Sequence, residues 1–322
     1  MSSFRWYDKA DIVAFSRHKG RLKAVMEMVW GIIGFLFPQP DHAQLPPRLP
    51  CRQPCRYAQA LYPLPRPRIF QPKDKPYWYI DTHSGAGLYD LSGDEAQKVG
   101  EYKQGIALLE QADKLPAELA EFVGRLKQIL PQDNLYCGSP WLAQALTRDS
   151  DKMRLFELHP ADFVHLQNNM REVRPARKVQ VSQADGYQGL ISLLPPPPRR
   201  AAVLIDPPYE EKQDYRRVVQ VLKDALKRFE TGCYMVWYPC LSHEESRKLP
   251  DELKKIVPDN YLHAELHVHT PSSNGFGMHG SGMFVINPPY MLAEQLQNNL
   301  PELAKILAQD AGAHYVLESK TK

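Results

Sequence analysis

The chain has 322 residues, of which 43% are hydrophobic and 24% charged, the composition of a globular protein with room for one large domain or two. Its apolar runs are too short to span a bilayer and five cysteines do not indicate a disulfide framework, so we expect a cytoplasmic protein with no membrane partner. The net charge of +3 comes from residues 1–72, because the remainder has 29 Lys or Arg against 33 Asp or Glu; bulk charge therefore gives no support to nucleic-acid binding.

Residues 1–72 differ in character from the rest of the chain. Proline and arginine are dense in the second half of this segment, and neither a helical nor a strand period is visible there. A disordered linker is one interpretation. The genetic code offers another, because synonymous codons for His42 to Lys73 permit a helix-like peptide one nucleotide later, starting at a methionine codon. We therefore predict an out-of-frame or disordered segment over 1–72 and a folded domain over 73–322.

The aromatic and branched stretch Tyr77–Asp81 predicts a strand. Thr82-His83-Ser84-Gly85-Ala86-Gly87 follows, and its glycines let the backbone approach a ligand closely, although a plain strand-to-helix turn has the same composition. The next strand that ends in an acid is Met153–Glu157, much further on than the spacing of about 20 residues in dinucleotide-type folds. Residues from about 90 to 136 show helical spacing with mixed charge, so we expect a small helical insertion subdomain there.

Three further polar positions follow strands or open helices. Gly138-Ser139-Pro140 begins a helix, with Ser139 at the N-cap and Pro140 at the first position. Glu157 ends its strand, where a carboxylate can accept both hydroxyls of a ribose or form an ordinary surface ion pair. Asp185 and Gly186 follow a half-buried strand, and Asp185 has the position of a helix cap.

The stretch Ala201–Tyr209 carries the most specific chemistry. Its five small or branched apolar residues predict a fully buried parallel strand, and two prolines end it at the edge where open α/β sheets bind ligands. Asp206 at the strand tip, the Pro207 carbonyl and the Tyr209 ring suit a planar base that carries an NH2 group. Two acceptors that pull the N–H bonds of adenine out of the ring plane would localise the lone pair toward a methyl donor. An ordinary proline-rich turn is the simpler interpretation of the four residues Asp206–Tyr209 alone.

The remaining predicted elements are a helix from Arg216 to Phe229, strands over Cys233–Tyr238, Tyr261–His269 and Gly282–Ile286, and one amphipathic helix in the tail. Two groups of residues suggest a metal without completing a site. Cys233, Cys240 and His243 lack the second pair of a tetrahedral set, and His267 and His269 share a strand face that is more often packed than ligating. We therefore expect core cysteines and no metal.

Together the motifs resemble those of a bacterial family, the J-type 23S rRNA adenine-N6 methyltransferases. The resemblance covers the chain from Lys73 onward, and its markers are Asp81-Thr-His-Ser-Gly-Ala-Gly87, Gly138-Ser-Pro140, Glu157-Leu-His-Pro160, Ala184-Asp-Gly186, Asp206-Pro-Pro-Tyr-Glu210, Trp237-Tyr-Pro239 and Ser281-Gly-Met283. It implies the Rossmann-like α/β fold of class I methyltransferases, with a central, mostly parallel seven-stranded sheet and helices on both faces. It also implies S-adenosylmethionine as cofactor and a monomer that methylates N6 of one adenine in 23S rRNA, either deproteinised or in an early assembly intermediate.

The same resemblance assigns roles to residues that match the family motifs. The residues expected to bind S-adenosylmethionine are His83, Ser139, Glu157, Asp185 and Gly186. Asp206 and Pro207 are the expected catalytic acceptors, and Tyr209 is expected to stack on a base flipped from its helix. The family's RNA-contacting tyrosine and its Lys-His pair have no counterpart in residues 1–72. We therefore expect the chain as it stands to methylate poorly.

Two alternatives stay open at this point. A DNA adenine-N6 methyltransferase would hold a flipped adenine by the same edge. A non-catalytic nucleic-acid-binding protein, linked to the use of external DNA by an older label of the same family, would need only the binding groups.

Overall fold

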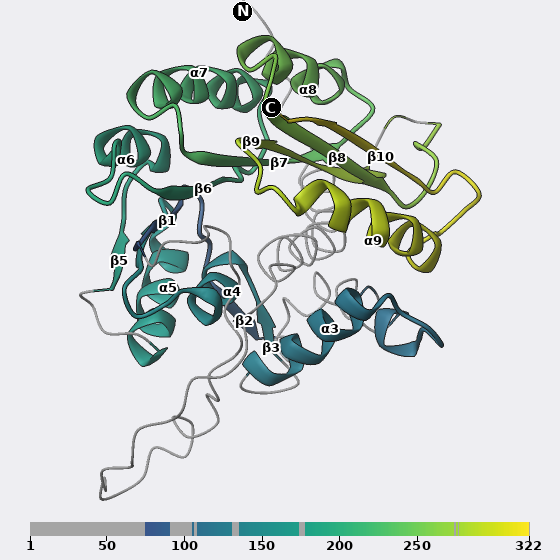
Figure 1. Ribbon diagram of the computed structural model, residues 1–322, viewed down its shortest axis with the longest axis horizontal. Helices are drawn as coiled ribbons and strands as arrows, with labels where there is room; N and C mark the ends of the chain where they lie inside the picture. The colour runs from purple at the N-terminus through teal and green to yellow at the C-terminus, as the bar shows by residue number, and fades with distance from the viewer. Residues whose placement is uncertain are drawn as a thin grey trace, which may run out of the picture.

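The computed structural model describes residues 75–90, 105, 108–130, 135–173, 178–273, 275 and 277–321, and a mixed sheet of eight strands lies at its centre (Figure 1). The strand order is β10-β8-β9-β7-β6-β1-β4-β5. The five strands β7, β6, β1, β4 and β5 are parallel. On the other side of β7, the strands β9, β8 and β10 pair in antiparallel fashion. The strands are β1 (Trp78–Asp81), β4 (Lys152–Phe156), β5 (Val179–Ser182), β6 (Ala201–Ile205), β7 (Cys233–Cys240), β8 (Tyr261–His267), β9 (Gly280–Ile286) and β10 (His314–Lys320).

Helices cover both faces of this sheet. In Figure 1, α6, α7 and α8 lie along one face, and α4, α5 and α9 lie along the other. These helices are α4 (Ser139–Leu146), α5 (Pro160–Val173), α6 (Gly186–Leu193), α7 (Lys212–Arg228), α8 (Glu244–Ile256) and α9 (Leu292–Ile306). The architecture is therefore an α/β sheet with helices on both faces, as the family resemblance implies.

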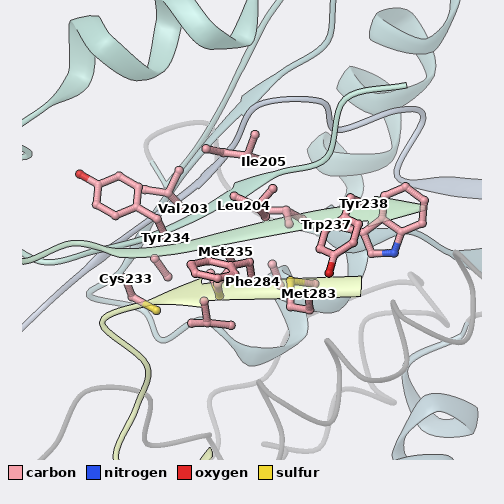
Figure 2. Close-up of a cluster of buried hydrophobic side chains, with 14 of the residues drawn as sticks. Val203, Leu204, Ile205, Cys233, Tyr234, Met235, Trp237, Tyr238, Met283 and Phe284 are labelled. Carbon is pink, nitrogen blue, oxygen red and sulfur yellow. The ribbon is translucent and has the colours of Figure 1, made fainter. Parts of the chain in front are cut away.

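The core is centred on β6, β7 and β9, which are buried at every position. Side chains from these three strands, among them Val203, Tyr234 and Phe284, pack together in Figure 2. Strands buried on both faces consist of consecutive apolar residues rather than alternating ones, as Ala201–Ile205 does. Each fully buried large apolar side chain stabilises the fold by about 1.5–3 kcal/mol.

Two predictions about the sheet are wrong in detail. The sheet has eight strands instead of seven, because the tail forms strand β10 after helix α9 instead of one helix with a frayed end. Strand β10 pairs with β8 along its whole length, from His314 opposite His267 to Lys320 opposite Tyr261. Its side chains are half-buried or exposed, so the segment lacks the apolar alternation that would have marked it as a strand.

Helix α7 begins four residues before the predicted Arg216. Glu211 and Asp214 form a capping box in which each side chain bonds the backbone N–H of the other residue, and this fixes the start at Lys212. Strand β7 is also longer than predicted, because it continues through Pro239 to Cys240.

The predicted insertion lies between β1 and β4. Its described part contains helix α3 (Ala117–Ile129), and a two-stranded sheet of β2 (Leu88–Asp90) and β3 (Leu135–Cys137) brings its ends together. The predicted segment 1–72 lies outside the described residues. Among the helices that the structure describes, none combines the length and apolar character needed to cross a membrane.

Candidate active site

Four loops meet along the edge where the parallel strands end. The order β6-β1-β4-β5 places Asp206, Asp81, Glu157 and Asp185 side by side in that sequence, each at or just beyond the tip of its strand. The register confirms the alignment of the central tips, since Asp81 lies opposite Leu155 on one side and Leu204 on the other. Open α/β sheets bind ligands at this edge, so four acidic residues here define the candidate site.

Asp81 is the most connected of the four. Its Oδ2 accepts hydrogen bonds from Ser139 Oγ at 2.7 Å and Tyr79 Oη at 3.0 Å, and its Oδ1 accepts one from the His83 amide at 3.2 Å. Complete burial raises the pKa of Asp81 to about 6, against the lowering effect of these hydrogen bonds, and the nearby Asp206 carboxylate also raises it. No sequence motif predicted a site role for Asp81. Its position at the tip of the central strand, just before the glycine loop, was the available signal.

Ser139 and His83 lie on either side of Asp81. The N-cap of α4 is Gly138 and Ser139 is the first helical residue, so the prediction of a Ser139 N-cap is wrong. Because Gly138 takes the extended cap conformation, the Ser139 hydroxyl is turned toward Asp81 instead of the helix amides. His83 is half-buried, with Nδ1 hydrogen bonded to Thr82 Oγ1 at 2.8 Å and its ring against Tyr187 at 4.9 Å.

Glu157 is fixed by two backbone amides. Its Oε2 accepts from the Gly85 N–H at 2.7 Å and its Oε1 from the His159 N–H at 2.7 Å. Gly85 has φ +59°, and a Cβ there would lie 2.2 Å from the Tyr89 hydroxyl, so this loop conformation requires glycine. Each carboxylate oxygen keeps a lone pair beyond the amide that it binds. A half-buried, oriented carboxylate of this kind fits the two hydroxyls of a ribose.

Asp185 is the N-cap of α6, as its position predicts. Its Oδ1 accepts from the amides of Tyr187 and Gln188, and its Oδ2 pairs with Arg217 Nη2 at 2.8 Å. Partial burial raises the pKa of Asp185, but the amides and Arg217 together hold that pKa below its usual range. Gly186 packs directly on the loop after β1, because a Cβ there would lie 1.8 Å from the Thr82 carbonyl oxygen. The β1 and β5 loops are therefore in close contact.

The Asp206–Tyr209 turn closes the other side of the site. Asp206 is 7% exposed and Tyr209 only 2%. The Tyr209 hydroxyl donates to the Trp237 carbonyl at 2.7 Å, and its ring packs on Tyr215 with centroids 4.7 Å apart. This differs from the expectation that Tyr209 presents a face to a base, since stacking would require the ring to leave its buried position. In the structure Tyr209 anchors the turn to β7, with the left-handed backbone angle φ +52°.

The structure thus brings the predicted residues together in two groups. His83, Ser139, Glu157 and Gly186 surround the loop after β1, and Asp206, Pro207 and Tyr209 form the turn after β6. Asp81 lies between the groups, hydrogen bonded to Ser139 and close enough to Asp206 for their charges to interact. Arg217 on α7 orients Asp185 and lies over the Tyr187 ring at 4.8 Å.

Comparison with known proteins identifies the family. The sequence model of the family described as ribosomal RNA large subunit methyltransferase D, RlmJ, matches residues 74–318. The chain belongs to this family. Two curated proteins named ribosomal RNA large subunit methyltransferase J are similar to it: that of Escherichia coli K12 is 42% identical over 244 residues, covering 75% of this chain and 86% of the relative. That of Haemophilus influenzae is 40% identical over 249 residues, covering 76% and 87%.

One solved structure agrees with this membership. A crystal structure of the Legionella pneumophila protein LPL1258 is 33% identical, with a TM-score of 0.69, and the match covers 77% of this chain and 90% of that one. Members of this family are S-adenosylmethionine-dependent rRNA methyltransferases with the class I fold, and so is this chain. The oriented Glu157 carboxylate and the close-packed glycine loops are groups that fit this cofactor.

Proposed function

We propose that this protein transfers a methyl group from S-adenosylmethionine to N6 of one adenine in 23S rRNA. The observation that carries the proposal is the Asp206-Pro207 turn at the tip of β6, next to the glycine loop of β1 in the sheet. The names of the two relatives, both large-subunit rRNA methyltransferases, support the substrate class. The sulfonium cofactor supplies an activated methyl group, so the protein's task is to position the acceptor amine.

At the cofactor end, the proposal assigns the ribose hydroxyls to Glu157, whose oxygens are held in place by the Gly85 and His159 amides. The adenine end belongs at Asp185 and Gly186, where the α6 cap lies against the β1 loop. His83 and Ser139 then line the methionine end. Ser139 is held by Asp81, so Asp81 positions it without touching the cofactor.

At the acceptor end, the Asp206 carboxylate and the Pro207 carbonyl accept hydrogen bonds from the two N–H groups of the adenine amine. The nitrogen lone pair forms the new bond to the methyl carbon while the carbon–sulfur bond breaks. The extra proton then leaves the nitrogen along its hydrogen bond to the Asp206 carboxylate and passes to solvent, and S-adenosylhomocysteine and N6-methyladenine are the products. Stabilisation of the developing charge by fixed acceptors of this kind is typically worth 10²–10³ in rate, roughly 3–4 kcal/mol.

The experiment compares three substrates with tritiated S-adenosylmethionine: deproteinised 23S rRNA, assembled large subunits and duplex DNA. We expect transfer to deproteinised rRNA, little to subunits and none to DNA, with N6-methyladenine at one position on mass mapping. Faster transfer to DNA would favour a DNA methyltransferase. Binding of the cofactor and RNA without transfer to any substrate would favour a binding protein. Size measurements on the same sample test the proposed monomer.

The proposal for residues 1–72 concerns the reading frame. The family match begins at residue 74, and the matches to the two relatives cover 86% and 87% of their lengths, although 72 residues precede Lys73 in this chain. This supports an out-of-frame origin for 1–72. Resequencing the DNA around codon 72 tests it directly, since an unbroken frame would refute it. A frame-corrected chain should then transfer methyl groups at least about tenfold faster than the chain as it stands, which corresponds to about 1.4 kcal/mol in transition-state binding.

A further inference from the structure

A second polar cluster lies in the antiparallel half of the sheet, away from the loops described above. Strand β9 runs between β7 and β8, and Gly280 lies opposite both Cys240 of β7 and His267 of β8. Gly282, two residues further along, likewise lies opposite Tyr238 and Glu265. Residues two apart in a strand share a face, so these two glycines leave a trough on one face of β9.

Side chains from β7 and β8 meet across this trough. A Cβ on Gly280 would lie 2.8 Å from His267 Nδ1, and one on Gly282 would lie 2.0 Å from the Tyr238 ring. The two glycines therefore leave room for the larger side chains of the flanking strands. As a result, one ligand atom each from Cys240, Glu265 and His267 lies within 4.8 Å of the others.

We propose that Cys240, Glu265 and His267 bind a divalent transition-metal ion, with zinc as the best chemical match. Zinc accepts thiolate, imidazole and carboxylate ligands in one site, at about 2.0–2.3 Å each. Hard cations such as magnesium prefer all-oxygen sites, so the thiol argues against them. On binding, Cys240 releases its thiol proton to solvent, and the proton that His267 Nε2 shares with Glu265 moves to Nδ1 of the same ring. Two metal bonds then replace the 2.9 Å hydrogen bond between His267 and Glu265.

The surroundings of Glu265 resemble the outer ligand sphere of a metal site. Its Oε1 accepts from the Tyr238 hydroxyl at 2.7 Å and lies 3.3 Å from His263 Nε2, whereas Oε2 faces His267. Outer hydrogen bonds of this kind orient a ligating carboxylate and leave one oxygen for the ion. Tyr238 is itself fixed by His263 Nε2 at 2.6 Å.

His279 provides an independent observation at the same place. It is 8% exposed, and its Nδ1 is buried without a hydrogen-bond partner in the described structure. Its ring stacks on His267, with centroids 5.3 Å apart. A buried imidazole nitrogen that lacks a partner costs stability unless something binds it. His279 is therefore our candidate for a fourth ligand.

The test uses the full chain, stripped with a chelator and then titrated with zinc chloride in a calorimeter and with cobalt chloride in a spectrophotometer. We expect about one ion per chain, a thiolate-to-cobalt charge-transfer band and a higher melting temperature with zinc. Cys240→Ser should abolish the band, and His267→Ala should weaken binding at least about tenfold, as loss of one ligand does. Cys233→Ser, a buried cysteine at the opposite end of β7, and His165→Ala, an exposed histidine on α5, are matched controls that should bind normally.

Two results would overturn the proposal. One is the absence of zinc uptake by the unaltered chain, which would leave the cluster as a hydrogen-bonded network. The other is uptake that both Cys240→Ser and His267→Ala retain. Circular dichroism shows whether each variant is folded. Glu265→Gln serves as a third variant that removes the carboxylate charge while keeping its shape, and it too should lose binding.

Discussion

The parallel and antiparallel halves of the sheet place their polar side chains in different ways. In the parallel half, Asp81, Glu157 and Asp206 project from strand tips and the loops after them, at one edge. In the antiparallel half, Tyr238 and Glu265 lie within the strands and meet across a glycine of the strand between them. Carboxylates at strand tips line the edge where open α/β sheets bind ligands, whereas groups inside a sheet face link the strands that carry them. The first half therefore suits catalysis and the second suits structure.

A matched pair of glycine substitutions should have the largest effect and tests the difference between the two halves of the sheet. Gly186→Ala and Gly282→Ala each introduce a Cβ about 2 Å from existing atoms, the Thr82 carbonyl and the Tyr238 ring respectively. Each should lower the free energy of unfolding by roughly 3 kcal/mol or more, as overpacking does. Only Gly186→Ala should also lose cofactor affinity in calorimetry. Equal loss of cofactor affinity in both variants would contradict the assignment of cofactor binding to the parallel half of the sheet alone.

The next effect is a pH dependence that belongs to the parallel half. Burial raises the pKa of Asp81 from 3.8 to about 6, so the folded protein holds this proton more tightly than the unfolded chain. The contribution of this proton to the free energy of unfolding is complete below about pH 4 and is lost as the pH rises through about 6. The total loss is about 3 kcal/mol, because a pKa difference of one corresponds to about 1.4 kcal/mol. Asp81→Asn should remove this slope from denaturant curves measured between pH 4 and 7. If the free energy of unfolding of that variant keeps the same dependence on pH, other titratable groups cause it.

A smaller effect concerns the contact between the start of helix α4 and the end of strand β1. Ser139→Ala removes the 2.7 Å hydrogen bond to Asp81, and hydrogen bonds to charged groups are worth about 1.5–3 kcal/mol. We expect cofactor affinity to fall about tenfold. Ser192→Ala on α6, whose hydroxyl bonds only the Gly189 carbonyl in the described structure, is the control and should bind normally. If both variants bind alike, Ser139 has no role at the cofactor.

The smallest effect should come from Arg217, which is partly exposed. Its bond to Asp185 is a surface ion pair, worth about 0–1 kcal/mol. Arg217→Ala should therefore weaken cofactor binding by less than about fivefold, and added salt should reduce the difference between variant and parent. A loss of a hundredfold would instead mean that Arg217 contacts the cofactor or the RNA directly.

The two halves also differ in what the sequence reveals. Motifs in the parallel half are contiguous, so Asp206 with its prolines and the glycine loop after Asp81 could be located by reading along the chain. Cys240, Glu265 and His267 are brought together only by the register of three strands. Along the sequence, Cys240 and His267 belong to separate groups, and neither group completes a metal site. Strand β10 and the burial of Tyr209 were missed for the same reason, because both depend on tertiary pairing.

The central claim is that the Asp206 carboxylate and the Pro207 carbonyl hold an adenine amine for methyl transfer. The most direct measurement combines calorimetry with tritium transfer to deproteinised 23S rRNA for Asp206→Ala in the frame-corrected chain. We predict that S-adenosylmethionine binding is retained within about threefold while transfer falls by roughly 10²–10³ or more. Transfer within tenfold of the parent, with the same affinity for the cofactor, would contradict the account.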